Sequence, residues 1–221
     1  MIYLDNCSTT QIDSEVLKEM MPFLQDQFGN EASKFHKLGQ KANEAVNVAR
    51  KKVAKVINAD TSEIVFTSGA TESINLALKG IVNDYSNTHI ITSQIEHKAV
   101  LECCKYLENF GVEITYLPVN SDGLIAIDDL KSAIKPNTKL VTIIFGNNEI
   151  GTVQDVETIG SICKQNSIPF MTDATQVVGK IKIDVDKYNI DMLCFSAHKI
   201  HGPKGVGALY KRKNININSL I

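Results

Sequence analysis

Short apolar runs rich in β-branched residues recur along the chain, and each predicts a β-strand. The runs cover residues 64–67, 89–92, 113–117, 139–145, 170–172, 192–195 and 206–210. Most are apolar nearly throughout instead of alternating with polar residues, which is typical of strands buried on both faces of a sheet. Segments with helical periodicity separate most of them, as at Ile159, Ile162 and Cys163. Such alternation predicts an α/β fold with a mostly parallel sheet covered by helices on both faces.

A long amphipathic segment precedes the first of these runs. Its apolar residues recur every three or four positions, with charged residues between them. The apolar positions are Ala42, Ala45, Val46, Ala49, Val53 and Val56, and the charged ones are Lys41, Glu44, Arg50 and Lys51. We expect a helix of several turns that lies against the sheet. The tail, residues 211–221, has no clear pattern and predicts no regular structure.

Composition places the chain among ordinary globular proteins. With 221 residues it can form one large domain, or a domain with a small appendage, and bury a core without disulfides or metals. Its net charge of −2 excludes a nucleic-acid binder driven by bulk electrostatics. No apolar run is long enough to span a membrane, and the first residues lack the features of a signal peptide. The five cysteines show no C-x-x-C spacing, so we expect a reduced, cytoplasmic protein with neither disulfides nor a zinc site.

Polar clusters follow five of the predicted strands, at the end of an open α/β sheet where ligands bind. The first cluster is Thr67–Glu72, which precedes a helical pattern. Gly69 allows a tight turn, and the free N–H groups of the next turn, with the Thr71 hydroxyl, form an anion site suited to phosphate. The same residues also suit a simple helix cap.

The second and third clusters are weaker signals. Glu96 and His97 follow the 89–92 run, but a lone histidine is more often structural than catalytic. The residues Asn147–Glu149 follow the 139–145 run. Their amides can orient a ligand by fixed hydrogen bonds, or they can form an ordinary turn.

The last two clusters carry the charges that catalysis needs. Asp173 opens Asp173–Gln176 directly after a buried strand, where a carboxylate needs a cationic or strongly donating partner unless it caps a helix. Lys199 ends Ser196–Lys199, just before a glycine-rich stretch. It is either a surface charge or an amine nucleophile with a lowered pKa.

Together the five clusters match the needs of pyridoxal 5′-phosphate. A lysine forms the Schiff base with this cofactor, and a carboxylate keeps its pyridine nitrogen protonated so that the ring acts as an electron sink. A helix N-terminus holds its phosphate. Lys199, Asp173 and the turn at Gly69 supply these three parts.

Six segments of the chain closely resemble the NifS/IscS-type cysteine desulfurases of the class-V aminotransferase family. They are Tyr3–Thr10, Ser68–Ser73, Glu96–Val100, Asn147–Gly151, Asp173–Gln176 and Ser196–Gly205. The match runs in order over essentially the whole chain. The resemblance implies a type I pyridoxal-phosphate fold, in which a seven-stranded sheet forms the cofactor domain and the last strand, 206–210, is antiparallel.

The resemblance also implies a role for each site residue. Lys199 is the internal-aldimine lysine, Asp173 pairs with the pyridinium nitrogen, and His97 stacks on the ring and shuttles protons. Asn148 and Gln176 hold the ring substituents. The residues implied to bind the phosphate are Ala70, Thr71, Ser196 and His198.

The activity implied is removal of sulfur from L-cysteine to give L-alanine. The sulfur passes to an acceptor thiol and on to scaffold or other acceptor proteins for iron–sulfur cluster assembly or tRNA thiolation. Family members are homodimers, and we expect no direct contact with nucleic acid or membrane.

The chain departs from the family in length and in one turn. Glu31 follows Asn30 where the family usually has proline, and Cys7 and Ser8 are milder changes. Family members are nearly twice as long, and their small domain and nucleophilic cysteine lie in the part beyond residue 221. We therefore expect an N-terminal arm at 1–15 and a cofactor-binding large domain at 16–221, without the C-terminal small domain. None of the five cysteines is expected to replace the missing nucleophile.

Two alternatives remain open from the sequence. One is another enzyme of the same fold, such as a selenocysteine lyase or an aminotransferase. The other is a truncated, non-catalytic chain that only binds the cofactor or a partner.

Overall fold

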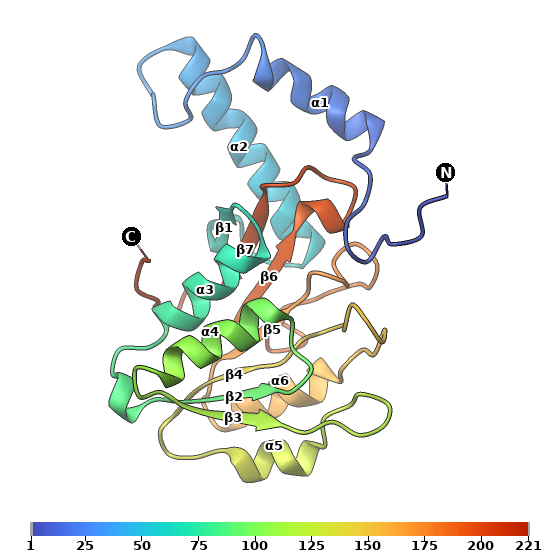
Figure 1. Cartoon of the computed structure of the whole chain (residues 1–221). Helices are drawn as coiled ribbons and strands as arrows, with labels where there is room; N and C mark the ends of the chain where they lie inside the picture. Colours follow the sequence, from blue (N-terminus) through green and yellow to red (C-terminus); the bar gives the residue numbers. More distant parts are fainter. Residues whose placement is uncertain (1, 221) are drawn as a thin grey trace.

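A seven-stranded sheet forms the centre of the protein, as the sequence predicts (Figure 1). The computed structural model describes residues 2–220. The strands are β1 (Ile64–Thr67), β2 (His89–Ser93), β3 (Glu113–Leu117), β4 (Thr138–Thr142), β5 (Phe170–Asp173), β6 (Met192–Ser196) and β7 (Gly207–Lys211). Their order is β1-β7-β6-β5-β4-β2-β3. Strand β7 is antiparallel to both neighbours and the other pairs are parallel, so the predicted antiparallel last strand is confirmed.

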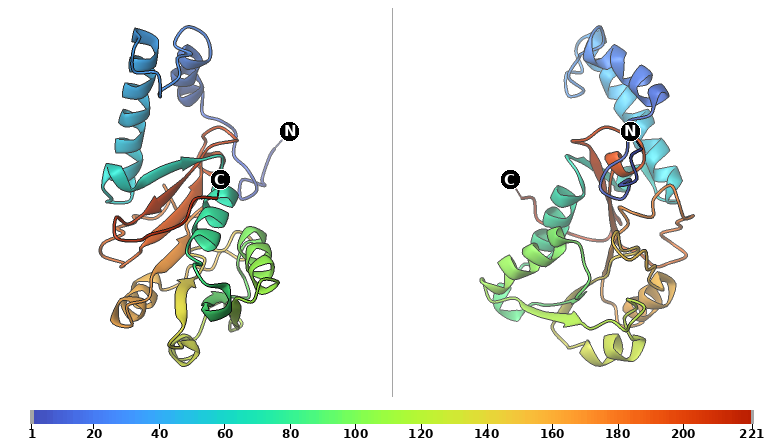
Figure 2. Two further views of the ribbon diagram at one scale, coloured as in Figure 1. Left: turned by 90° about the vertical axis from the view of Figure 1, so that its left-hand side faces the viewer. Right: turned by 45° about the vertical axis from the view of Figure 1, so that its right-hand side comes forward.

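Helices cover both faces of this sheet (Figures 1 and 2). The α-helices of the described residues are α1 (Ser14–Leu24), α2 (Lys37–Val56), α3 (Ala70–Gly80), α4 (Lys98–Glu108), α5 (Ile127–Ala133) and α6 (Val156–Gln165). Helices α3 and α4 pack on one face, and α5, α6 and the end of α2 pack on the other. Successive strand residues point to opposite faces, so Ile90 belongs to the first core and Ile91 to the second. The continuous apolar runs in the sequence follow from this double burial.

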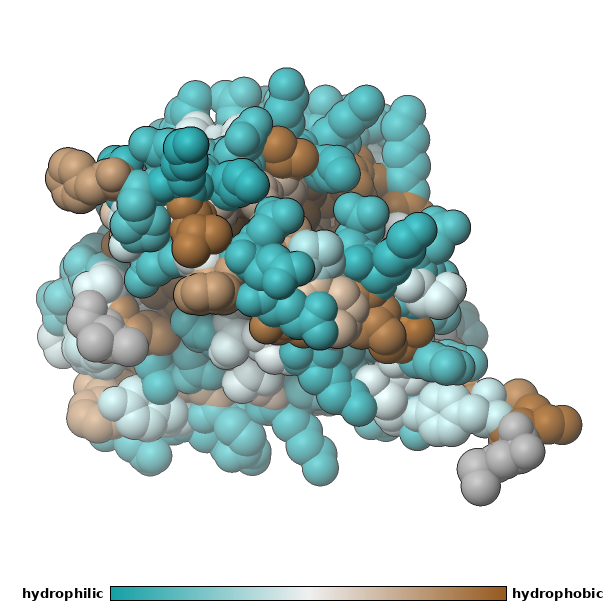
Figure 3. Space-filling view, turned by 90° about the horizontal axis from the view of Figure 1, so that it is seen from above, coloured by the Kyte–Doolittle hydropathy of each residue, from teal (hydrophilic) through white to brown (hydrophobic). Residues whose placement is uncertain are grey.

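The predicted amphipathic helix exists as α2, but it lies against the sheet only at its C-terminal end. Val53 of the predicted stripe packs against the core there, whereas Ala49 is exposed. The first half of α2 and the whole of α1, which has no buried residue, project beyond the sheet (Figure 2). Figure 3 looks onto this end and shows apolar side chains among hydrophilic ones. The first half of the apolar stripe therefore lies beyond the sheet.

Strand β4 ends at Thr142, three residues before the end of the apolar run at Phe145. The segment continues beside β5, since Ile143 N donates to Met171 O and Phe145 N donates to Asp173 O. The intervening Ile144 N donates instead to the side chain of Glu96, at 2.7 Å. The Glu96 side chain thus accepts the hydrogen bond of Ile144 N in place of a backbone carbonyl.

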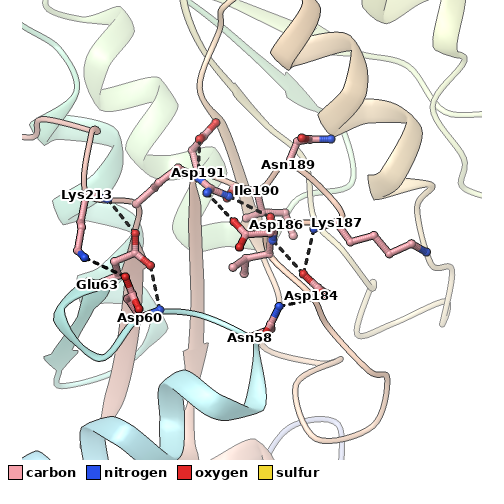
Figure 4. A network of polar contacts seen from close by, with 12 residues as sticks. Asn58, Asp60, Glu63, Asp184, Asp186, Lys187, Asn189, Ile190, Asp191 and Lys213 are labelled. Carbon is pink, nitrogen blue, oxygen red and sulfur yellow. Dashed lines mark hydrogen bonds and ion pairs between the residues drawn. The ribbon is translucent and has the colours of Figure 1, made fainter.

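A polar network ties together the segments at the amino ends of β1 and β6 (Figure 4). Arg212, directly after β7, pairs with Asp186 at 2.7 Å and with Asp191 at 3.2 Å. Lys213 pairs with Asp60 at 2.8 Å. These contacts anchor the end of β7 to the loops before β1 and β6.

The ends of the chain add little regular structure. Residues 212–220 contain no helix or strand, as expected for the tail, while Met1 and Ile221 lie outside the described residues. The division at residues 15 and 16 into an arm and a large domain stays a prediction; α1 begins at Ser14. Within residues 2–220, no helix combines the length and the apolarity needed to cross a bilayer.

Candidate active site

A cavity of about 250 Å³ lies where the parallel strands end at their carboxyl sides. All nine residues predicted to contact the cofactor line it: Ala70, Thr71, His97, Asn148, Asp173, Gln176, Ser196, His198 and Lys199. Within residues 2–220, four surface hollows are larger. Those of about 520, 810 and 540 Å³ contain none of the nine residues, whereas one of about 370 Å³ adjoins the cavity and shares Ala70, Thr71, Ser196 and His198 with it. The fold therefore brings the sequence clusters together at one place.

The phosphate side of the cavity is the start of α3. Ala70 N donates to Ser196 Oγ at 2.7 Å, which joins the first turn of α3 to the end of β6. Strand β7 also begins very close to this turn, because a Cβ added at Gly207 would lie 2.6 Å from Gly69 Cα. The first-turn N–H groups of a helix have no intrahelical acceptors, and the helix dipole favours an anion there. This corner can hold a phosphate.

Asp173 supplies the negative charge of the cavity. It is the last residue of β5 and is 5% exposed. Its Oδ1 accepts a hydrogen bond from Thr175 N at 2.9 Å, and it forms no ion pair within residues 2–220. Residues 175–180 form turns, so the helix that Asp173 would cap in the alternative interpretation is absent there. A buried carboxylate with so few donors suits a positively charged or N–H partner.

Lys199 ends a short 3₁₀ helix, Ala197–Lys199, and is partly buried. Burial lowers the pKa of its ammonium group, and Lys180 adds to this effect, while Cys7, Asp173 and Asp5 oppose it. A lowered pKa raises the fraction of neutral amine, the form that acts as a nucleophile.

The N-terminal segment lies across the mouth of the cavity, a placement that sequence reasoning missed. The backbone carbonyl of Cys7 accepts hydrogen bonds from Lys199 Nζ and, at 2.8 Å, from Gln176 Nε2. Thr9 Oγ1 and His198 Nδ1 lie 3.1 Å apart, and Thr10 N donates to His198 O at 2.8 Å. The resemblance of Tyr3–Thr10 to the family is the sequence signal for this segment, but it implies no role for these residues.

His97 both caps a helix and lines the cavity. It is the N-cap of α4, and its Nδ1 accepts a hydrogen bond from Ala99 N at 3.1 Å. In the neutral ring the proton is therefore assigned to Nε2, which can donate toward a ligand. The ring is exposed at the cavity rim, so a planar ligand has access to it.

The donors and acceptors of this cavity fit pyridoxal 5′-phosphate. The α3 N-terminus offers N–H groups for the phosphate, Asp173 an acceptor for a protonated ring nitrogen, and Lys199 an amine for the aldehyde. Asn148 and Gln176 offer side-chain amides for the ring substituents. Among residues 2–220, no cluster of three or more His, Cys, Asp or Glu side chains is arranged to hold a metal.

The cysteines divide into two groups. Four are buried, and burial raises the pKa of each of these thiols, to about 11 for Cys103 and about 12 for Cys163. A buried thiol with a raised pKa is a poor nucleophile. Cys7 is exposed and does not line the cavity, although its carbonyl accepts a hydrogen bond from Lys199 Nζ.

Comparisons with known proteins agree with this geometry. The family model described as "Aminotransferase class-V" matches residues 2–218. A cysteine desulfurase IscS from Buchnera aphidicola (subsp. Acyrthosiphon pisum, strain 5A) is 51% identical over 99% of this chain and 55% of its own length. A probable mitochondrial cysteine desulfurase of Dictyostelium discoideum is 53% identical over 96% of this chain and 48% of its own length.

Solved structures show the same likeness. The structure titled "SspA in complex with cysteine" has a TM-score of 0.97 and 46% identity, over 100% of this chain and 65% of that one. A "NIFS-like protein" has a TM-score of 0.96 and 45% identity, over 100% of this chain and 61% of that one. The chain thus spans about half the length of the curated relatives it matches.

Proposed function

The chain belongs to the class-V aminotransferase family, and on that premise we propose that it forms the cofactor-binding part of a pyridoxal 5′-phosphate-dependent cysteine desulfurase. The observation that carries the proposal is the single cavity that gathers all nine predicted contact residues. The relatives that are 51% and 53% identical to this chain over the aligned region are named cysteine desulfurases, which supports this choice within the family.

Different residues of this chain would bind the ring and the phosphate of the cofactor. When bound, pyridoxal phosphate supplies an electron sink for carbanion chemistry. Asp173 stabilises a positive charge on the ring nitrogen by a charge-assisted hydrogen bond. The first turn of α3, with Thr71, Ser196 and His198, holds the phosphate.

Lys199 would bind the cofactor aldehyde, and both Lys199 and His97 would transfer protons. The lowered pKa of Lys199 raises the fraction of its neutral amine, the form that would bind the cofactor and accept a proton once released. His97 stacks on the ring, and its Nε2 exchanges a proton with the substrate. For Lys199 to reach a ligand, its hydrogen bond to the Cys7 carbonyl must break.

The substrate we propose is L-cysteine, with L-alanine as product and the sulfur accepted by a thiol. The related protein SspA is described in complex with cysteine. The four buried cysteines are unsuited to accept the sulfur, because their raised pKa values disfavour the thiolate. The onward partner is an iron–sulfur scaffold or another sulfur-acceptor protein, and the working unit is a homodimer.

A cytoplasmic location is part of the same proposal. Relatives include bacterial enzymes as well as mitochondrial and mitosomal ones. Location therefore varies among the relatives.

Cofactor titration of Lys199→Ala tests the proposal. The unmodified protein should develop a visible absorbance band with pyridoxal phosphate, and borohydride should fix the cofactor to Lys199. Lys199→Ala should lose both, while Lys131→Ala, which removes an exposed lysine on α5, should keep both. A band retained in Lys199→Ala contradicts the assignment.

Product analysis separates desulfuration from the alternatives. Alanine and acceptor-bound sulfur formed from cysteine support a desulfurase. Preference for selenocysteine indicates a lyase, and a requirement for a keto acid indicates an aminotransferase. Binding of the cofactor with no turnover in the full-length protein indicates a non-catalytic role.

A further inference from the structure

Two side chains lie directly behind the cavity, each one residue before a proposed cofactor contact. Glu96 precedes His97, and Asn147 precedes Asn148. Neither Glu96 nor Asn147 lines the cavity itself. We propose that Glu96, held as a neutral carboxylic acid, and Asn147 form a reciprocal brace that fixes His97 and Asn148 against the cofactor. This inference rests on the proposed function, because it assigns a task to residues beside the cofactor contacts.

The first half of the brace runs from the loop after β2 to the segment after β4. Glu96 Oε1 accepts a hydrogen bond from Ile144 N at 2.7 Å and another from Ser93 Oγ at 2.6 Å. Ile144 lines the cavity. The contact thus fixes the backbone between the residue that precedes His97 and the wall of the cavity.

The second half runs in the opposite direction. Asn147 Nδ2 donates to Ile95 O at 2.9 Å, so the segment after β4 reaches back to the loop after β2. Asn147 Oδ1 accepts from Glu149 N at 2.8 Å and from Ile150 N at 3.1 Å, which shapes the turn that contains Asn148. Each loop therefore holds the other through one side chain.

The neutral state of Glu96 follows from its surroundings. The residue is 5% exposed, and its Oε2 is buried without a hydrogen-bond partner within residues 2–220. An ionised carboxylate with an unpartnered oxygen is costly in such a place, whereas the acid form still lets Oε1 accept both hydrogen bonds. Burial raises the pKa of Glu96 to about 8, and the charge of Asp173 adds to the rise.

A neutral Glu96 also benefits Asp173. Two ionised carboxylates at close range disfavour each other. A protonated Glu96 places no second negative charge next to Asp173, which lines the cavity. The brace thus supplies hydrogen bonds without a competing negative charge.

Glutamine and alanine substitutions at Glu96 separate this role from a requirement for charge. Glu96→Gln keeps a neutral oxygen that can accept from Ile144 N, and Glu96→Ala removes it. Asn147→Ala cuts the other half of the brace. Glu102→Ala, on the exposed face of α4, is the matched control.

The first measurement needs no cofactor. Hydrogen exchange at Ile144 N in the cofactor-free protein should be about tenfold faster in Glu96→Ala than in the unmodified protein, but nearly unchanged in Glu96→Gln and Glu102→Ala. If Ile144 N stays equally protected in Glu96→Ala, the brace does not exist.

The second measurement is cofactor titration followed by absorbance, with the pH dependence of the band recorded. Glu96→Ala and Asn147→Ala should bind pyridoxal phosphate about fivefold to tenfold more weakly and shift the pH at which the band changes, while Glu96→Gln restores both. Affinity and band unchanged in Glu96→Ala, or Glu96→Gln as defective as Glu96→Ala, overturns the inference. Should Glu96→Ala fail to fold, Asn147→Ala and Glu96→Gln decide the matter.

The two measurements also separate the inference from the proposed function. Absence of any cofactor band in the unmodified protein contradicts the function. In that case the exchange rate at Ile144 N still decides whether the brace is present.

Discussion

Replacing Glu96 with glutamine should flatten the pH dependence of folding stability. Folding raises the pKa of this carboxyl from 4.5 to about 8, chiefly through burial. The titratable groups whose charges couple to it are Asp173 on β5, Cys194 on β6 and Cys104 on α4. Between these two pKa values the folded protein retains a proton that the unfolded chain releases. The free energy of unfolding must therefore fall as the pH rises through this window.

The size of the effect follows from the two pKa values. From about pH 6 to about pH 9, the rise from 4.5 to about 8 removes about 2–3 kcal/mol from the free energy of unfolding. Glu96→Gln has no proton to lose, so this part of the pH dependence should disappear in that variant.

Urea unfolding of the cofactor-free protein at these two pH values measures the difference. His89 and His198, whose pKa values are lowered by burial, titrate in both proteins and cancel in the comparison. If both proteins lose the same free energy between the two pH values, within about 0.5 kcal/mol, the buried acid is not the cause.

Three further predictions concern the cavity and the thiols. Asp173→Asn should weaken pyridoxal phosphate binding by about tenfold to a hundredfold in a titration, because a charge-assisted hydrogen bond contributes about 1.5–3 kcal/mol; unchanged affinity would refute its role at the ring nitrogen. Gly207→Ala places a Cβ 2.6 Å from Gly69 Cα. It should reduce the preference for pyridoxal phosphate over pyridoxal, and an unaltered ratio argues against a phosphate site at α3. With an aromatic disulfide reagent, the native protein should show one fast-reacting thiol, at the exposed Cys7; a second fast thiol contradicts the burial of the others.

The strands were predictable because of how this sheet is buried. A parallel strand covered on both faces carries apolar residues continuously, as Leu140 and Val141 do on β4. The position of the cavity was predictable for a related reason, since polar side chains interrupt the apolar pattern where such strands end. Asp173 and Lys199 both stand out in this way.

The position of α2 could not be predicted from its pattern. An amphipathic stripe shows that one face of a helix needs a cover, but it does not identify that cover. In this chain Val53 of the stripe packs against the sheet core, while Ala49 stays exposed. The sheet therefore covers only part of the apolar stripe.

The contacts of the arm and of the brace were hidden for a different reason. The carbonyl of Cys7 meets Lys199, and the backbone N–H of Ile144 meets Glu96. Every residue except proline carries both backbone groups, so the sequence at Cys7 and Ile144 holds no trace of these contacts. Only the fold determines which backbone groups come within reach.

The placement of β1 determines the order in which the molecule can assemble during synthesis. Within residues 2–220, β1 pairs with no strand other than β7, so residues 68–206 must leave the ribosome before its partner does. Until then β1 has no strand with which to pair, and its apolar side chains stay uncovered. Such late long-range pairing slows folding and leaves intermediates prone to aggregate. The same late step brings the turn at Gly69 beside the start of β7 and the end of β6. The proposed phosphate site at the start of α3 therefore forms only when β7 joins the sheet. Binding of the cofactor would then show that β7 has paired.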